Sequence, residues 1–357
     1  MAKQKILGFV KTEWLFVLAL VGLGSTSLYL RRVPVYTRSD FQILYILFVL
    51  FVVTTGLREH HVLARVARRL EQGRGVAFKL VLATFFFSML VTNDVALLTV
   101  VPLTMLLRVR RKDWLVILEA LAANAGSALS PFGNPQNLFI YWHYQVPLGQ
   151  FVRVIAPFAV FFLVVLMLAA WWLRIDGQPV VWEETPFEPL TFSAYFYLVA
   201  LAVVALTVLR VLPLATGVFV LGYALWRDRQ SLKVDYALLL TFACFFGFTD
   251  NLQRMLATAL AHPQHVFLLA AGLSQVISNV PAALLLADFT HQWPALLWGV
   301  SVGGFGSLIG SLANLIAYRG YLRETQGQVV RFTLRFHLLS YAAFFLGVVL
   351  YWCLFVA

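Results

Sequence analysis

A polar segment interrupts a long apolar region between residues 114 and 146. The segment covers residues 124–137, reads NAGSALSPFGNPQN, and contains two prolines, two glycines and three asparagines. Proline removes a backbone donor and glycine lowers helix stability, so we predict that Pro131, Gly133 and Pro135 unwind the chain here. Unwound backbone at membrane depth is tolerated only where protein buries it or where it lines a watery cavity. The segment therefore predicts a broken membrane helix at a ligand site.

The composition predicts a polytopic membrane protein. The chain is 61% hydrophobic and 12% charged, with 31 phenylalanines, whereas soluble domains are roughly 25% charged. Its net charge of +11 comes largely from Lys and Arg in short loops between apolar runs, where these residues set membrane orientation. We therefore expect no nucleic-acid partner. Cys244 and Cys353 lie inside apolar runs, so we predict neither a disulfide framework nor a metal cluster.

The basic loops predict the orientation of the chain in the membrane. Spans over 14–30 and 41–57 place the amino terminus in the cytoplasm, and a basic interfacial helix is expected over 58–75. A cleaved signal peptide is the alternative for the first run, but no Ala-x-Ala site follows it. Nine spans in total place the carboxy terminus outside. The acidic loop 174–190 is assigned to the cytoplasm by counting spans, although its own charge does not favour either side.

Two pairs of short apolar arms surround polar tips, over 76–107 and 265–289. At about 1.5 Å per residue, each arm is shorter than the roughly 30 Å hydrocarbon core. We therefore predict two re-entrant hairpins whose tips lie at mid-membrane. For the first pair, two short spans joined outside by an ordinary turn would place the flanking basic clusters on the same side, so charge leaves that alternative open.

The order of these elements occurs twice along the chain. Each half reads as a span, an interfacial helix, a hairpin, a broken helix and a final span, with the second interfacial helix expected over 251–261. The second half starts from the opposite side of the membrane, and inverted repeats with discontinuous helices are typical of secondary transporters. The predicted units are a first repeat, 1–173 (hairpin 76–107, broken helix 114–146), a linker with an extra helix, 174–209, and a second repeat, 210–357 (hairpin 265–289, broken helix 294–318).

The hairpin tips and the two polar breaks supply candidate ligands. Helix amino termini and amide groups donate hydrogen bonds to anions, whereas hydroxyl, amide and backbone carbonyl oxygens suit sodium. We predict that ion and substrate are bound by residues of these segments: Thr92, Asn93, Asp94, Asn124, Gly126, Ser127, Gly133, Asn134, Asn137, Ser278, Asn279, Gly306, Ser307 and Asn314.

Three acidic residues raise separate questions. A carboxylate at mid-membrane costs several kcal/mol unless it is paired, protonated or bound to a cation, so we favour an ion or proton role for Asp94 over a helix cap. Glu119, near the start of the broken helix, is a possible proton site, but we favour a shallow residue that reaches the interface. Asp250 is expected to cap the second interfacial helix.

The first tip and the first break resemble those of the citrate-transporter-like ion transporter superfamily. The resemblance is carried by residues 91–98 (VTNDVALL), 101–103 (VPL) and 133–137 (GNPQN), and it covers nearly the whole chain. That superfamily includes arsenite permeases of the ArsB type, NhaD-type sodium/proton antiporters and divalent anion/sodium symporters, and the likeness extends to small YbiR-like inner-membrane permeases.

The resemblance implies elevator movement of the hairpin domains against a scaffold, within a homodimer in the bacterial inner membrane. In the dicarboxylate symporters each tip reads Ser-Asn-Thr and helps to hold carboxylate and sodium. Here the third tip positions are Asp94 and Val280, which argues against a dicarboxylate substrate.

The sequence lacks the motifs of an intramembrane protease or of an ATP-driven pump, so we expect a transporter and not an enzyme. The prediction is an all-α secondary transporter that moves a small anion, either an oxyanion or a carboxylate, with sodium or protons as the coupling ion and no other cofactor. The alternatives are sodium/proton antiport and arsenite-type efflux, and the residues alone do not exclude a passive channel.

Overall fold

The computed structural model describes residues 13–70, 75–109, 111–172, 177–178, 189–255, 263–325 and 329–356. This part of the chain is almost entirely helical, as the composition predicts. Two two-residue strands, β1 (Arg108–Val109) and β2 (Gly177–Gln178), form a short antiparallel pair. The acidic loop 174–190 otherwise lies almost wholly outside the described residues.

Helices of the first half include the predicted hairpin and broken helix. The hairpin arms meet at Val91 and Thr92, and the broken helix is interrupted over residues 128–134. This interruption is shorter than predicted, because helix continues through Asn124 as far as Ser127. Pro135 begins the next helix, where the missing backbone donor of proline costs nothing. The helices are α5 (Val76–Leu90), α6 (Asn93–Leu106), α7 (Lys112–Ser127), α8 (Pro135–His143) and α9 (Leu148–Trp172).

The second half contains the same arrangement. The arms of its hairpin meet at Ser278, and its broken helix is interrupted over residues 304–311. In both halves the first arm of the hairpin packs along the first part of the broken helix, α5 on α7 and α13 on α15. The helices are α13 (Pro263–Ile277), α14 (Asn279–Ala287), α15 (Trp293–Gly303), α16 (Leu312–Glu324) and α17 (Val329–Phe355).

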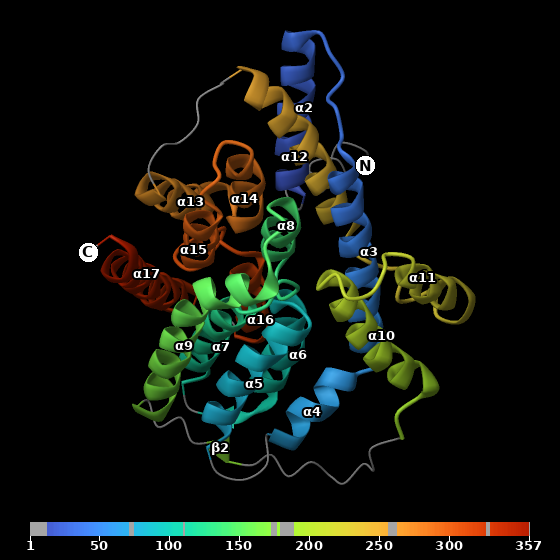
Figure 1. Ribbon diagram of the computed structural model, residues 1–357. Helices are drawn as coiled ribbons and strands as arrows, with labels where there is room; N and C mark the ends of the chain where they lie inside the picture. Colours follow the sequence, from blue (N-terminus) through green and yellow to red (C-terminus); the bar gives the residue numbers. More distant parts are fainter. Residues whose placement is uncertain are drawn as a thin grey trace, which may run out of the picture.

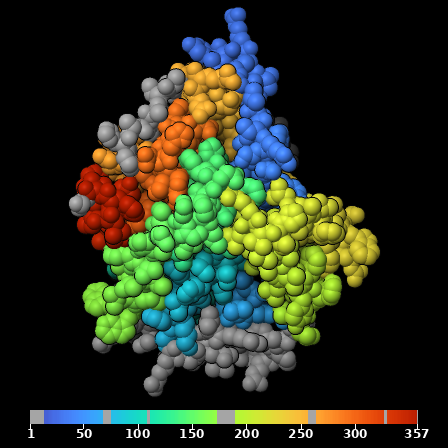
Figure 2. Space-filling model, viewed as in Figure 1, coloured from blue at the N-terminus to red at the C-terminus, as the bar shows by residue number. Residues whose placement is uncertain are grey.

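The remaining helices border these two groups. Figure 1 shows α2 and α12 paired at the top of the view and α3, α10 and α11 on the right, beside the hairpins and broken helices. In Figure 2 the blue α2 and the gold end of α12 project beyond the rest of the molecule. Their bounds are α2 (Trp14–Leu30), α3 (Arg38–Glu59), α4 (Val62–Leu70), α10 (Phe192–Val208), α11 (Thr216–Arg227) and α12 (Tyr236–Met255).

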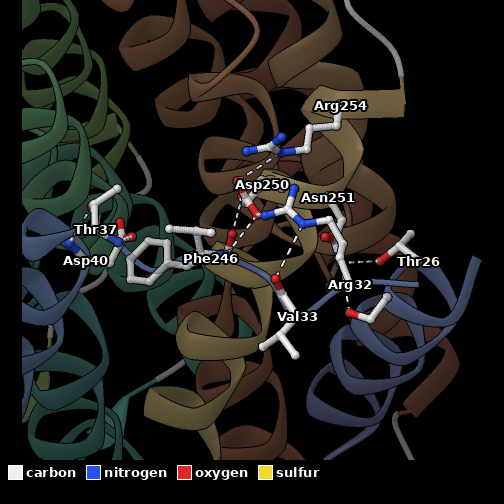
Figure 3. A network of polar contacts seen from close by, with 12 residues as sticks. Thr26, Arg32, Val33, Thr37, Asp40, Phe246, Asp250, Asn251 and Arg254 are labelled. Carbon is white, nitrogen blue, oxygen red and sulfur yellow. Dashed lines mark hydrogen bonds and ion pairs between the residues drawn. The ribbon is translucent and has the colours of Figure 1, made fainter. Parts of the chain in front are cut away.

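The structure corrects the prediction of a second interfacial helix over 251–261. Residues 251–255 continue α12 without interruption, and residues 256–261 lie outside the described part. Asp250 therefore does not cap a helix. Its carboxylate pairs with Arg32 at 2.5 Å and accepts a hydrogen bond from the Val35 amide at 3.0 Å, as Figure 3 shows in part. The loop after α2 thus satisfies the carboxylate of Asp250, and α12 continues past this residue.

The structure is that of an integral membrane protein. Among the described residues, three helices are long and apolar enough to cross a membrane by themselves: α3, α9 and α17. Of the most apolar stretch of each helix, 33% is buried within the protein in α9 and 22% in α17, against 61% in α3. The helices α9 and α17 are therefore largely exposed on the surface of this chain, while α3 lies between the right-hand helices and the hairpins.

Candidate functional site

The two halves repeat the same hydrogen bonds around their interrupted helices. The backbone amide of Asn93 donates to the Gly133 carbonyl at 3.2 Å, and the backbone amide of Asn279 donates to the Gly310 carbonyl at 3.0 Å. Each hairpin tip is thus attached to the break of its own half. One serine hydroxyl in each break also donates to the hairpin: Ser130 donates to the Met89 carbonyl, and Ser307 donates to the Gln275 carbonyl.

An asparagine side chain closes each break. Asn137 Nδ2 donates to the carbonyls of Ser127, Ala128 and Ser130. Asn314 Nδ2 donates to those of Gly304 and Ser307 at 2.9 Å each. Unwound segments leave carbonyls without helical partners, and a buried unsatisfied carbonyl is costly. These two predicted site residues therefore stabilise the breaks.

A chain of buried amides connects the two halves. Asn93 Nδ2 lies 3.4 Å from Asn124 Oδ1, and Asn124 Nδ2 donates to Asn314 Oδ1 at 2.9 Å. Asn93 Nδ2 also lies 3.4 Å from the Ser311 hydroxyl. The first hairpin tip thereby contacts the second broken helix directly.

The second tip reaches the same place. A Cβ atom on Gly304 would lie 3.2 Å from Asn279 Nδ2 and 3.4 Å from Asn124 Oδ1. Gly304 therefore lies between the side-chain amide of Asn279, in the second hairpin tip, and the side-chain amide of Asn124, which is bonded to the first tip. The two tips, far apart in sequence, border one site.

A cavity of about 140 Å³ lies at this meeting point. Five of the predicted site residues line it: Asn93, Asp94, Asn134, Ser278 and Asn279. Val280, Ile309, Leu312 and Leu315 supply an apolar wall.

Four helices begin at this cavity, namely α6, α8, α14 and α16. Their N-cap residues are Thr92, Asn134, Ser278 and Ser311. The amino-terminal turn of a helix carries a partial positive charge and unsatisfied amides. Four such ends around one small cavity favour an anion.

Asp94 places a carboxylate beside these helix ends. Its Oδ1 is buried and has no hydrogen-bond partner among the described residues, although the residue lines the cavity. The helix cap is provided instead by Thr92, whose hydroxyl accepts from the Val95 amide. A buried carboxylate oxygen without a partner requires a proton or a cation.

The other predicted site residues lie behind the cavity wall. Gly126 packs against α5, and Ser127 donates to the Asn124 carbonyl. Gly306 adopts a left-handed φ of 89°, and a Cβ there would lie 2.2 Å from Gln275 Oε1. These residues, like Thr92 and Gly133, shape the breaks and tips without lining the cavity.

Glu119 is fully buried, which overturns the prediction of a shallow residue at the interface. Its exposed fraction is 0%, and its Oε1 accepts a hydrogen bond from Thr104 on α6. Its Oε2 has no partner among the described residues. The sequence does not show this, because the burial of Glu119 depends on how other helices, among them α6, pack against α7.

Sequence reasoning missed several residues of the cavity. Gln136 and Ser311 line it next to the predicted Asn134 and Asn279. Ser311 could have been found from the repeat, because it precedes α16 as Asn134 precedes α8. Glu13, Asp235 and Arg319 also line the cavity, but none of them belongs to a local sequence motif.

These three residues add charges to the cavity lining. Burial and the neighbouring Asp235 carboxylate raise the pKa of Glu13. Arg319, on α16, provides a positive charge in the same lining. The residues belong to segments that the charge pattern assigns to the cytoplasmic side.

Among the described residues, no group of three or more His, Cys, Asp or Glu side chains is arranged to hold a metal ion. The polar lining consists mainly of amides, hydroxyls and single charges. Such groups suit a small anion, a proton or a hard monovalent cation better than a transition metal.

Comparison with known proteins gives a consistent family. The citrate transporter model matches residues 12–303. The inner membrane protein YbiR of Escherichia coli K12 is 39% identical over 275 residues, covering 71% of this chain and 72% of the relative. The transporter MJ0456 of Methanocaldococcus jannaschii is 29% identical over 87% of this chain and 90% of its own. The silicon efflux transporter LSI3 of rice is 24% identical over 82% and 81%.

Proposed function

The chain belongs to the citrate transporter family and is a membrane transporter, not an enzyme, and from this premise we propose that it moves a small anion in exchange for, or together with, sodium or protons. The observation that carries the proposal is the convergence of four helix amino termini on one small cavity that also holds the unpartnered carboxylate of Asp94. The helix ends favour an anion, and the carboxylate requires a cation or a proton.

Alternating access through two inverted repeats is the proposed mechanism. The repeated hydrogen bonds at the two tips and breaks support an internal repeat. The orientation of the basic loops supports nine spans, two hairpins of opposite orientation, a cytoplasmic amino terminus and an outer carboxy terminus. In this proposal the hairpins and broken helices move as one body against a scaffold that includes α2, α3 and α10–α12, within a homodimer in the bacterial inner membrane.

The cavity supports an inward-facing arrangement. Its lining includes Glu13, Asp235 and Arg319, which the charge pattern assigns to the cytoplasmic side. On the opposite side, the Tyr144 hydroxyl donates to the carbonyls of Ala287 and Thr290. These bonds connect the ends of α8 and α14, which supports an arrangement in which the cavity opens to the cytoplasm and is closed to the outside.

The size of the cavity limits the substrate. About 140 Å³ is well below the roughly 300–1,000 Å³ of pockets for drug-sized ligands. The name of the rice relative, a silicon efflux transporter, also favours a small oxyanion or oxyacid over a large carboxylate. Sodium/proton antiport is the second candidate, because Asp94 is the one ionisable side chain among the cavity-lining residues of the two hairpin tips.

Two measurements on the purified protein test this proposal. A thermal-shift screen of small oxyanions and carboxylates, with and without sodium and across pH, identifies the ligand. Uptake of that ligand into proteoliposomes under an imposed sodium or proton gradient then tests coupling. Uptake that follows the gradient is expected; uptake at the same rate without any ion gradient would favour a passive channel.

A further inference from the structure

A second cavity lies where α8 and α14 end, away from the central cavity at their amino termini. His143, the last residue of α8, and Asp288, the C-cap of α14, both line it. Its volume is about 120 Å³, and its lining also includes Asp40, Asp250 and Gln253. We call it the outer cavity, because counting spans assigns the segments that carry these residues to the outside.

The outer cavity lies between the two bodies of the proposed function. His143 and Asp288 belong to the helices that are proposed to move, whereas Asp40 of α3 and Asp250 of α12 belong to the proposed scaffold. Figure 3 shows these two scaffold residues. A hydrogen bond crosses the boundary, from Gln253 Nε2 of α12 to the Asp288 carbonyl at 2.6 Å. The outer cavity is therefore part of a contact that changes when the bodies move.

The two scaffold carboxylates are compensated unequally. Asp250 pairs with Arg32 at 2.5 Å and lies 3.9 Å from Arg254. Asp40 accepts a hydrogen bond from the Thr37 amide at 2.7 Å, but it has no ion pair with another described residue. No lysine or arginine is among the described residues that line the outer cavity. The negative charge of Asp40 therefore faces the moving helices without a cation of its own.

His143 is the one residue in this lining that can supply a positive charge. Its Nε2 lies 3.6 Å from Asp288 Oδ1, a distance that suits an ion pair and is too long for a good hydrogen bond. The contact gains its full strength only when the imidazole is protonated, and free imidazole titrates near pH 6.5. The side chain of His143 is 27% exposed, so protons from outside can reach it.

Other segments beside α8 add no titratable group to this lining. The helix α15, which contacts α8, reads WPALLWGVSVG and contains no ionisable residue. Arg210 contacts the carbonyls of Tyr141 and Val146 near the same end of α8, but it does not line the outer cavity. Tyr144 donates its hydroxyl to two carbonyls. The charge balance of the outer cavity thus depends on His143.

We propose that His143 is a proton-operated latch: protonation of its imidazole from outside attracts the moving helices to the scaffold and holds the transporter in the inward-facing arrangement. The inference rests on the proposed function and adds to it a regulator, the proton, at a site away from the central cavity.

The direction of the effect follows from the charges. Movement of α8 and α14 away from α3 and α12 takes the imidazolium of His143 away from Asp40, and from Asp250 to a lesser extent because Arg32 compensates Asp250. Asp288 moves together with His143, so their own attraction does not distinguish the two arrangements. The protonated form therefore prefers the inward-facing arrangement, and acid outside should disfavour the outward-facing one.

The test measures the distance between the two bodies as the pH changes. Spin labels are attached to cysteines at Val218 of α11 and Leu268 of α13, both exposed, in a background without Cys244 and Cys353. Double electron–electron resonance is recorded in lipid nanodiscs, with unlabelled protein added so that distances within one chain dominate. We expect the inward-facing distance to prevail at about pH 5.5, and the ratio of the second distance to it to rise about fivefold by about pH 8.

Variants separate the charge of His143 from its packing. His143→Gln is neutral at every pH and should remove the rise, whereas His143→Lys stays charged and should keep the inward-facing distance prevalent at both pH values. Asp40→Asn leaves His143 in place and should reduce the rise, which keeps the test valid if variants of His143 do not fold. His291→Gln, at an exposed histidine outside this lining, is the matched control and should behave as wild type.

Three results would overturn the inference: wild-type distances that do not change with pH, a pH response of His143→Gln equal to that of the wild type, or an Asp40→Asn response equal to that of the wild type. Asp94 and Glu13 are present in every variant, so the comparison isolates the outer cavity. Any of these results in a protein that takes up its anion would leave the proposed function intact. Absence of anion binding and uptake would refute the proposed function itself, whatever the distances show.

Discussion

The asparagines, serines and glutamine at the interrupted helices differ in what their side chains do. The side-chain amides of Asn137 and Asn314 donate to backbone carbonyls of the breaks, and that of Asn124 links the two halves. Only a few polar atoms remain for a ligand, and Asp94 Oδ1 and Gln136 Oε1 are the acceptors among them that lack a partner in the described structure. At this scale, function depends on the groups that packing leaves unsatisfied.

Asp94→Asn tests the role of the carboxylate in coupling. The substitution keeps the size of the side chain and removes its charge, so transport driven by an ion gradient should fall to background. Exchange of substrate across the membrane needs no net ion movement and should persist. Uptake and counterflow in proteoliposomes measure the two activities. Gradient-driven uptake near the wild-type rate would remove Asp94 from coupling and direct attention to Glu119.

Gly126→Ala tests the close approach of α7 to the first hairpin. A Cβ at this position would lie 2.1 Å from the Phe85 carbonyl oxygen, a backbone atom that cannot turn away. We expect a loss of about 1–3 kcal/mol of stability, the usual cost of overpacking, seen as a lower melting temperature. Gly149→Ala is the control, because nothing lies within 4 Å of its Cβ; equal melting temperatures for the two variants would contradict the packing argument.

At the scale of elements, the half-helices are positioned by contacts at both ends. Their amino termini meet at the cavity, and the carboxyl end of α8 is held by the turn between α10 and α11. Arg210 in that turn donates to the carbonyls of Tyr141 and Val146, and its guanidinium lies 4.5 Å from the centre of the Tyr141 ring. The Trp142 indole donates back to the Val208 carbonyl at 3.0 Å.

Arg210→Met removes these bonds and keeps most of the side-chain volume. Carbonyls at the end of α8 would lose their donor, so we expect a stability loss of about 1–3 kcal/mol, measured by thermal unfolding in detergent. Arg153→Met on α9 is the control, since Arg153 is exposed. A melting temperature for Arg210→Met as high as that of the control would show that the turn does not hold α8.

At the scale of the whole molecule, the inverted repeat predicts where equivalent residues lie. Arg111 follows the first hairpin and His291 follows the second, and both are exposed. In a background without Cys244 and Cys353, a single cysteine at Arg111 should react with a membrane-impermeant maleimide only from the cytoplasm, and one at His291 only from outside. Labelling of both from one side would refute opposite orientations of the repeats.

Features that depend on local chemistry are predictable from the order of amino acids. Hydropathy identified the membrane class, and proline, glycine and asparagine located both hairpin tips and both interrupted helices, because helix propensity and backbone hydrogen bonding act over a few residues. The same locality explains why the predicted break began too early: Asn124 and Ser127 disfavour helix only weakly, and burial keeps them helical.

Which polar groups reach the cavity, and which bond to other protein groups, depends on the packing of distant segments. Asp250 was expected to cap a helix but pairs with Arg32 from another element, and Glu119 is buried, with its Oε1 bonded to Thr104 of α6. Gln136 carries no signal in the sequence that separates it from its neighbours, since its orphan oxygen becomes evident only when all surrounding donors are placed. Satisfaction of a buried polar atom depends on residues far apart along the chain, and the order of amino acids alone does not specify that proximity.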